Sequence, residues 1–123
     1  MSNFSKQDIL KIFKMSDLYL KQKYPNGTTV EEISMQENLA FKQYVKFLSK
    51  NISLGKTRYN RKCEQLRVNW FVLESILKIM KMNKLNNVEN LNFCFENFDQ
   101  QSNLFSEYLK TEIYKSYLDD LEK

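Results

Sequence analysis

All three arginines of this chain lie in one short stretch, TRYNRKCEQLR, residues 57–67, whereas the other cations are lysines spread along the sequence. On a helix, Arg58, Arg61 and Lys62 fall within about one turn, so their charges share a face that can contact successive phosphates. Tyr59 lies between them and can stack on an unpaired base. We therefore predict that nucleic acid or an acidic protein surface binds at Lys56, Arg58, Tyr59, Arg61, Lys62 and Arg67.

The charge of the chain is unevenly distributed, although its formal net charge is only +4. Residues 42–67 carry eight basic groups and one acidic group, whereas residues 87–123 carry three basic and eight acidic groups. This asymmetry indicates a basic face with an acidic partner, which is nucleic acid, another protein or the chain's own C-terminal segment. A solvated helix face without a partner is the alternative.

The residues that most enzymes need are missing. The chain has no histidine, which removes the commonest general base and the commonest transition-metal ligand. SLGKT resembles the end of a phosphate-binding loop, but the first glycine of that motif would fall at Lys50 and no strand precedes it. Cys63 and Cys94 match no metal or redox spacing, so free thiols are expected. We expect a non-enzymatic protein with no metal, cofactor or small-molecule substrate.

Neither a leader nor a membrane segment is predicted. The N-terminal MSNFSKQDILKIFK lacks the apolar run of a signal peptide, and no later stretch approaches the roughly 20 apolar residues of a membrane span. The expected location is therefore cytoplasmic or nuclear and not secreted, with no membrane contact.

Helical periodicity dominates the first half of the chain. A first helix is predicted from Ser5, whose hydroxyl can cap it with Asp8 at the third helical position, to the turn PNG at residues 25–27. A second helix is predicted from a capping box in TVEE to a break near Gly55. The apolar positions at helical spacing are Ile9, Ile12, Phe13, Leu20 and Tyr24 in the first, and Val30, Ile33, Ala40, Phe41, Tyr44 and Leu48 in the second.

The second half favours helices as well. LNFCFEN, residues 91–97, fits a short strand or a helix, and a helix is preferred because no partner strand is evident. An amphipathic acidic helix is predicted from about Ser102 to the C-terminus. The sequence thus predicts a single all-α domain over residues 1–123, a compact bundle of four to five helices with a long central helix, or a helix-turn-helix, at residues 57–82.

Residues 57–82 support two interpretations. As one helix, the segment carries an apolar heptad seam and can serve as the central rod of the bundle or as the coiled-coil arm of a homodimer. The seam residues are Tyr59, Cys63, Leu66, Trp70, Leu73, Leu77 and Met80.

As two helices, residues 61–82, RKCEQLRVNWFVLESILKIMKM, resemble a helix-turn-helix unit. The matching positions are a small Cys63, apolar Leu66 and Val68 around the turn, a capping Asn69, and inward-facing Leu73 and Ile76. Arg67 stands where glycine is usual in the turn, and Lys62 where an aliphatic residue is usual. The pair Trp70 and Phe71 is also similar to a pair in the third helix of homeodomain-like proteins.

Such a unit implies DNA binding through the exposed start of its second helix. Here that surface would be Trp70, Phe71, Glu74 and Ser75, which suits a protein partner better than base edges. Two hypotheses follow. The first is a small nucleic-acid-binding or regulatory protein of the kind that viruses and mobile elements encode, with the basic patch at residues 56–67 on phosphates. The second is a protein-binding adaptor or inhibitor of a nucleic-acid-handling machine, with Trp70 and Phe71 as interface anchors.

Overall fold

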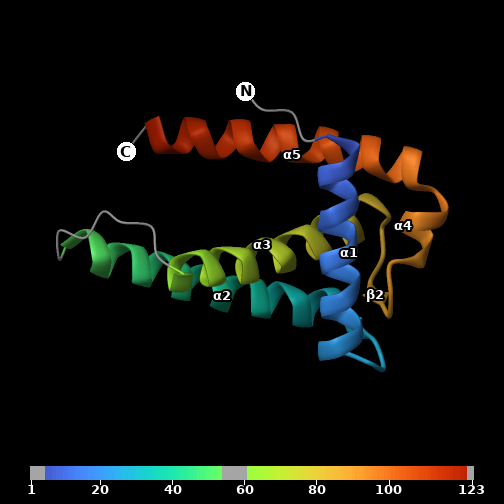
Figure 1. The fold of residues 1–123 in the computed structure, drawn as a ribbon, viewed down its shortest axis with the longest axis horizontal. Coiled ribbons are helices and arrows are strands. Elements are labelled where there is room, and N and C mark those ends of the chain that lie inside the picture. Colours follow the sequence, from blue (N-terminus) through green and yellow to red (C-terminus); the bar gives the residue numbers. More distant parts are fainter. Residues whose placement is uncertain (1–4, 54–60, 122–123) are drawn as a thin grey trace.

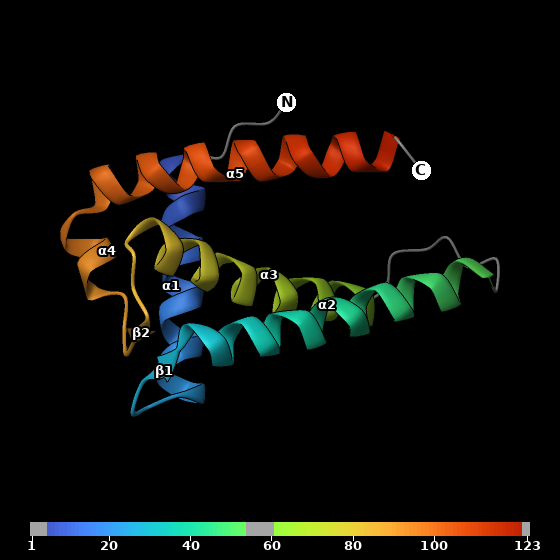
Figure 2. The ribbon, with the colours of Figure 1, turned by 180° about the vertical axis from the view of Figure 1, so that it is seen from behind.

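The computed structural model describes residues 5–53 and 61–121, with side chains described for residues 5–50 and 61–110. Within these ranges five helices and two very short strands follow one another (Figures 1 and 2). The elements are α1 (Lys6–Lys23), β1 (Thr28–Thr29), α2 (Val30–Ser53), α3 (Arg61–Met82), β2 (Asn87–Val88), α4 (Asn92–Glu96) and α5 (Phe98–Leu121). The predicted all-α bundle is confirmed. The last helix begins at Phe98, four residues before the predicted start.

Local capping sets the first helix as predicted. The Asp8 N–H donates to Ser5 Oγ at 3.1 Å and the Ser5 N–H donates to Asp8 Oδ2 at 3.2 Å, which completes a capping box. After the helix, Gly27 adopts a φ of +91°, a conformation that costs side-chain-bearing residues energy. The turn at residues 25–27 therefore ends α1 and redirects the chain into α2.

The two-stranded sheet was not predicted. Strands β1 and β2 pair antiparallel, with Thr28 opposite Val88 and Thr29 opposite Asn87. The Val30 N–H extends this pairing by donating to the Asn86 carbonyl at 2.8 Å. Two residues a strand are too few to produce a period-two pattern, so the sequence gives no sign of them. The sheet fixes the start of α2 beside the loop that follows α3. Residues 92–96, by contrast, form the predicted helix.

Helix α3 runs without interruption from Arg61 to Met82, so the turn of the two-helix interpretation does not occur in these residues. Residues 57–60 of the predicted helix lie outside the described residues. In the seam, Cys63, Leu73, Leu77 and Met80 are buried and Leu66 and Trp70 are half-buried, while Tyr59 is not described. Because α3 packs closely on α2, a homodimer through this seam would have to displace contacts made within the chain.

Helix α3 has two different halves. Its C-terminal half is buried on nearly every side, where α1 lies across α3 and α5 (Figures 1 and 2). Its N-terminal half pairs with the C-terminal half of α2, and together they project from this core. We call this projection, residues 42–53 and 61–71, the arm. Helix α5 projects in the same direction, and its ribbon stays apart from the arm in both views. No helix in the described ranges is long and apolar enough to cross a membrane.

Candidate nucleic-acid interface

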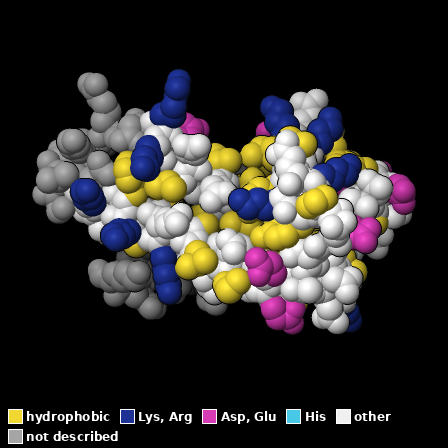
Figure 3. Space-filling model, turned by 90° about the horizontal axis from the view of Figure 1, so that it is seen from below, with side chains coloured by type: hydrophobic (Ala, Val, Ile, Leu, Met, Phe, Trp, Pro, Cys, Tyr) yellow, Lys and Arg dark blue, Asp and Glu magenta, His cyan; other side chains and the backbone are white. Residues whose placement is uncertain are grey.

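The arm concentrates positive charge from two helices. On α2, Lys42, Lys46 and Lys50 are exposed and recur every four residues, which places them along one face. Helix α3 adds the exposed Arg61 and Lys62 at its start, and Arg67 two turns later. Figure 3 shows Lys and Arg side chains gathered at this end of the molecule. The cations of the arm are Lys42, Lys46, Lys50, Arg61, Lys62 and Arg67.

A single carboxylate interrupts this surface. Glu64 is the one acidic residue between positions 42 and 67, and its Oε1 lies 3.8 Å from a guanidinium nitrogen of Arg67. Both side chains are well exposed, so this ion pair is weak. It leaves the positive field of the arm largely intact.

A pocket of about 410 Å³ lies between the two helices of the arm. Helix α2 lines it with residues spaced as one helical face, and α3 contributes two residues four apart. The half-buried lining residues, Phe47 and Leu66, are apolar, and none of the described residues that line the pocket is acidic. The described lining residues are Gln43, Lys46, Phe47, Lys50, Lys62 and Leu66. The site thus joins an apolar contact surface to three ammonium groups.

Half of the predicted basic site lies outside the described residues, namely Lys56, Arg58 and Tyr59. The other half, Arg61, Lys62 and Arg67, lies on α3. The structure adds Lys42, Lys46 and Lys50, together with Phe47, none of which was predicted as a site residue. A signal was present, because the basic excess counted over residues 42–67 includes all three of these lysines.

The predicted aromatic anchors, Trp70 and Phe71, make most of their contacts within the protein. The Trp70 Nε1–H donates to Glu37 Oε1 at 2.8 Å, and its ring stacks on Tyr44 with 6.1 Å between centroids. The Phe41 ring lies beside the same indole, with 5.4 Å between the ring centroids. Phe71 is partly buried and packs against the core. Trp70 and Phe71 are thus half-buried, whereas the two-helix interpretation would place them on an exposed surface. The large apolar side chains exposed on α2 are Met35, Leu39, Phe41 and Val45.

Charged side chains enter the core just beyond the arm. Lys78 is buried, and its Nζ lies 2.7 Å from Glu74 Oε1 and 4.8 Å from the centre of the Tyr108 ring. Burial raises the pKa of Glu37 above its ordinary value. The Trp70 hydrogen bond and the Lys78 charge lower that pKa, whereas Glu74 raises it further. Glu37 is therefore held in surroundings that penalise its ionisation.

We expect Glu37→Gln to become more stabilising, relative to the wild type, as pH rises. Below the ordinary glutamate pKa the side chain is protonated in both the folded and unfolded states, so the two proteins differ least. As pH rises through the raised folded-state pKa, the wild type loses stability because the unfolded chain ionises first. Glutamine keeps an acceptor for the Trp70 N–H. Urea unfolding between about pH 4 and 8 measures the effect.

The control is Glu31→Gln, an exposed position on the same helix. It should not gain stability relative to the wild type over that pH range. A Glu37→Gln variant whose stability tracks the wild type at every pH would contradict the assigned environment of Glu37.

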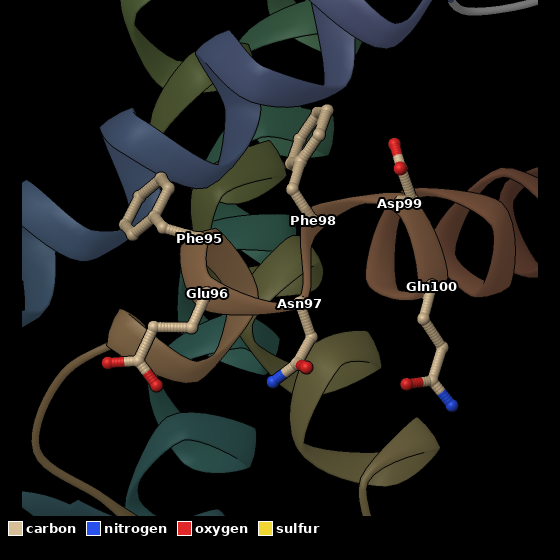
Figure 4. A pocket seen from close by; sticks show the side chains of 6 residues that line it. All are labelled: Phe95, Glu96, Asn97, Phe98, Asp99 and Gln100. Carbon is tan, nitrogen blue, oxygen red and sulfur yellow. The ribbon is translucent and has the colours of Figure 1, made fainter.

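A second hollow, of about 420 Å³, lies at the corner between α4 and α5 (Figure 4). Phe95 and Phe98 point toward α1, whereas Glu96 and Asn97 point away from it. Asp99 pairs with Lys6 across 3.0 Å. These polar side chains diverge and do not surround one reacting atom, so no chemistry is assigned to this hollow.

The two cysteines are the other reactive groups among the described residues. Both are buried thiols outside any disulfide, and burial raises the pKa of Cys94 to about 12, with the Asp17 charge adding to the rise. A thiol of that pKa is a poor nucleophile at neutral pH. Within the described residues, no three His, Cys, Asp or Glu side chains are grouped so as to hold a metal ion.

The arm can therefore bind anions through ammonium and guanidinium groups and apolar surfaces through the pocket between its helices. Figure 3 shows further Lys and Arg side chains on the other half of the molecule, where the exposed lysines include Lys11, Lys14 and Lys81. Comparisons with family models, curated proteins and solved structures find no match to this chain.

Proposed function

We propose that this is a non-enzymatic protein that binds nucleic acid through its arm. The observation that carries the proposal is the run of six cations, from two paired helices, against the single carboxylate of Glu64. Each phosphate neutralised by such a cation releases counterions, which is the main source of affinity in nucleic-acid binding. The predicted patch at residues 56–67 shares Arg61, Lys62 and Arg67 with this surface.

The regular spacing of the lysines supports a polyanion as the partner. At 1.5 Å rise per residue, Lys42, Lys46 and Lys50 follow one another at intervals of about 6 Å along α2. A repeated charge of one sign suits the repeated phosphates of a nucleic acid better than a folded protein surface that carries charges of both signs. The proposal therefore ranks nucleic acid above an acidic protein.

The first test is fluorescence anisotropy of the full chain against labelled duplex DNA, single-stranded DNA and structured RNA at several salt concentrations. We expect binding at low salt, with log affinity falling linearly against log salt. On duplex DNA the slope should be about 0.9 for each phosphate contacted. Absence of binding to all three probes at low salt would overturn the proposal.

The second test reverses charge on the arm. We expect Lys42→Glu/Lys46→Glu/Arg61→Glu to weaken binding by about tenfold or more and to lower the salt slope by about one for each lost contact. The matched control, Lys11→Glu/Lys14→Glu/Lys81→Glu, makes the same change of net charge at exposed lysines away from the arm. Equal losses in the two variants would mean that net charge, not the arm, drives binding.

A second candidate function is a protein-binding adaptor or inhibitor. It is favoured by Met35 and Leu39, which are 50% and 47% exposed and share a face of α2 with Lys42 and Lys46. Apolar residues beside cations resemble the composition of a protein interface more than that of a phosphate-binding surface. Under this alternative, Met35→Glu/Leu39→Glu would abolish capture of a protein partner. Nucleic-acid binding that survives this change would favour the first function.

A further inference from the structure

We propose that the pocket between Phe47 and Leu66 receives an unpaired base, so that the ligand of the arm is single-stranded nucleic acid. This inference rests on the proposed function, because it concerns the same arm. It goes further by assigning a role to the apolar surface that lies among the cations. Phosphate binding alone does not need that surface.

The lining of the pocket matches the parts of a nucleotide. Phe47 and Leu66 offer an aromatic ring and an aliphatic side chain, which can pack against the face of a base. Lys46, Lys50 and Lys62 also line it and can neutralise the phosphates on either side of that base. The amide of Gln43 can donate to and accept from a base edge without requiring one particular base.

Size and charge agree with this occupant. A volume of about 410 Å³ lies within the range of about 300 to 1,000 Å³ typical of pockets that hold small molecules. Among the described residues that line the pocket there is no carboxylate, so none of these side chains repels a phosphate. Phe47 lies between Lys46 and Lys50 in the lining because Gln43, Lys46, Phe47 and Lys50 share one face of α2.

A duplex would use this site poorly. Bases within a double helix are stacked on one another and present only their edges in the grooves, so Phe47 and Leu66 would gain no contact from them. Proteins that bind single strands combine a basic groove with aromatic side chains on which bases stack, and they tolerate many sequences. The pocket and the lysines around it supply both parts.

The test compares four probes of equal length by anisotropy at one low salt concentration: oligo-dT, oligo-rU, an abasic deoxyribose strand and duplex DNA. The abasic strand keeps the phosphates and lacks the bases. We expect the wild type to bind oligo-dT or oligo-rU at least about fivefold more tightly than the abasic strand, as one stacked base contributes. The ratio of oligo-dT to oligo-rU affinity tells whether DNA or RNA is preferred.

The key variant is Phe47→Leu, which keeps an apolar side chain and removes the aromatic face. It should lose about fivefold to a hundredfold in affinity for the two base-bearing strands and nothing for the abasic strand. The control is Phe41→Leu, the same substitution on the same helix outside the pocket. Its affinities should match those of the wild type.

A second variant tests the pocket independently of any effect that Phe47→Leu has on the packing of α2 against α3. Gln43 is exposed, so Gln43→Glu should leave the fold intact while placing a carboxylate in the pocket. It should weaken oligo-dT binding more than Ser49→Glu, which adds the same charge at an exposed position of α2 outside the pocket. Equal losses in these two variants would count against a base in the pocket.

The outcomes separate the two proposals. Failure of all four probes to bind overturns the proposed function and this inference with it. If the abasic strand and the duplex bind as tightly as oligo-dT at that salt concentration, the proposed function stands and the base pocket is overturned. Preference for base-bearing strands that Phe47→Leu removes and Phe41→Leu retains supports both.

Discussion

Replacing Lys78 with alanine is expected to lower the free energy of unfolding by about 3 to 5 kcal/mol, the usual result of removing one partner from a buried ion pair. Lys78 is 5% exposed on α3, and its Nζ contacts Glu74 at 2.7 Å and the Tyr108 ring of α5 at 4.8 Å. Without that ammonium group, the carboxylates of Glu74 and Glu37 face each other in a partly desolvated site. Urea unfolding at neutral pH measures the loss.

Two further variants separate charge from packing at this position. Glu74→Leu/Lys78→Met removes both charges and keeps apolar volume, so it should recover most of the stability that Lys78→Ala loses. Lys81→Ala, at an exposed position one turn away, should change stability by no more than about 0.5 kcal/mol. If the double replacement were as damaging as Lys78→Ala, lost packing rather than an unpaired charge would explain the effect.

The loss in Lys78→Ala should also shrink as pH falls. Burial already raises the pKa of Glu37, and the Lys78 charge is one of the groups that lowers it. Removing the Lys78 charge raises the folded-state pKa of Glu37 further. The variant therefore loses more stability than the wild type as pH rises through that pKa. At acid pH the Glu37 carboxyl group is neutral in both the folded and the unfolded state and needs no cation.

The helices could be predicted from the sequence where their causes are local. The box between Ser5 and Asp8 and the glycine turn after α1 depend on residues a few positions apart, and both are as expected. The helical period of the apolar residues in α3 is also visible in the sequence. It fits the one-helix and the two-helix interpretations equally well. The uninterrupted helix is favoured by contact with α2, which lies alongside it, and the apolar period within residues 57–82 does not contain that contact.

Burial of charged and polar residues could not be predicted in this way. Lys78 and Asp17 look like solvated helix positions in the sequence, yet both are buried. Asp17 accepts the Leu91 N–H at 2.8 Å and pairs with Lys21, so its burial depends on a loop seventy-four positions away. Hydrogen bonds between residues far apart in the sequence offset the free-energy cost of burying such a side chain. The helical periodicity of a sequence gives no information on these bonds.

The candidate site was predicted in part for the same reason. Clustering of the arginines pointed to α3, because those residues are neighbours in the sequence. Lys46, Phe47 and Lys50 belong to α2, and they join Lys62 and Leu66 only once the two helices pair. The two-helix interpretation would place Trp70 and Phe71 on an exposed surface. The structure half-buries both, and the sequence does not tell which aromatic residues a neighbouring helix will cover.

Phe13→Ala is the second large effect that we expect, a loss of about 3 to 5 kcal/mol in the free energy of unfolding, because it opens a cavity in the core. Phe13 is 0% exposed, and its ring meets those of Phe98 and Phe105 edge-on, at 5.9 and 5.3 Å between centroids. These contacts fix α1 across α5, so the loss should be measured by urea unfolding at neutral pH.

Two other variants serve as controls for Phe13→Ala. Phe13→Leu keeps most of the volume and should cost less than about 1.5 kcal/mol, and Met15→Ala, on the exposed face of the same helix, should cost about 0.5 kcal/mol or less. Because Phe13 lies in the core and not in the arm, folded Phe13→Ala should bind oligo-dT as the wild type does. A cost for Phe13→Ala no larger than that for Met15→Ala would mean that α1 is not packed across α5 as described.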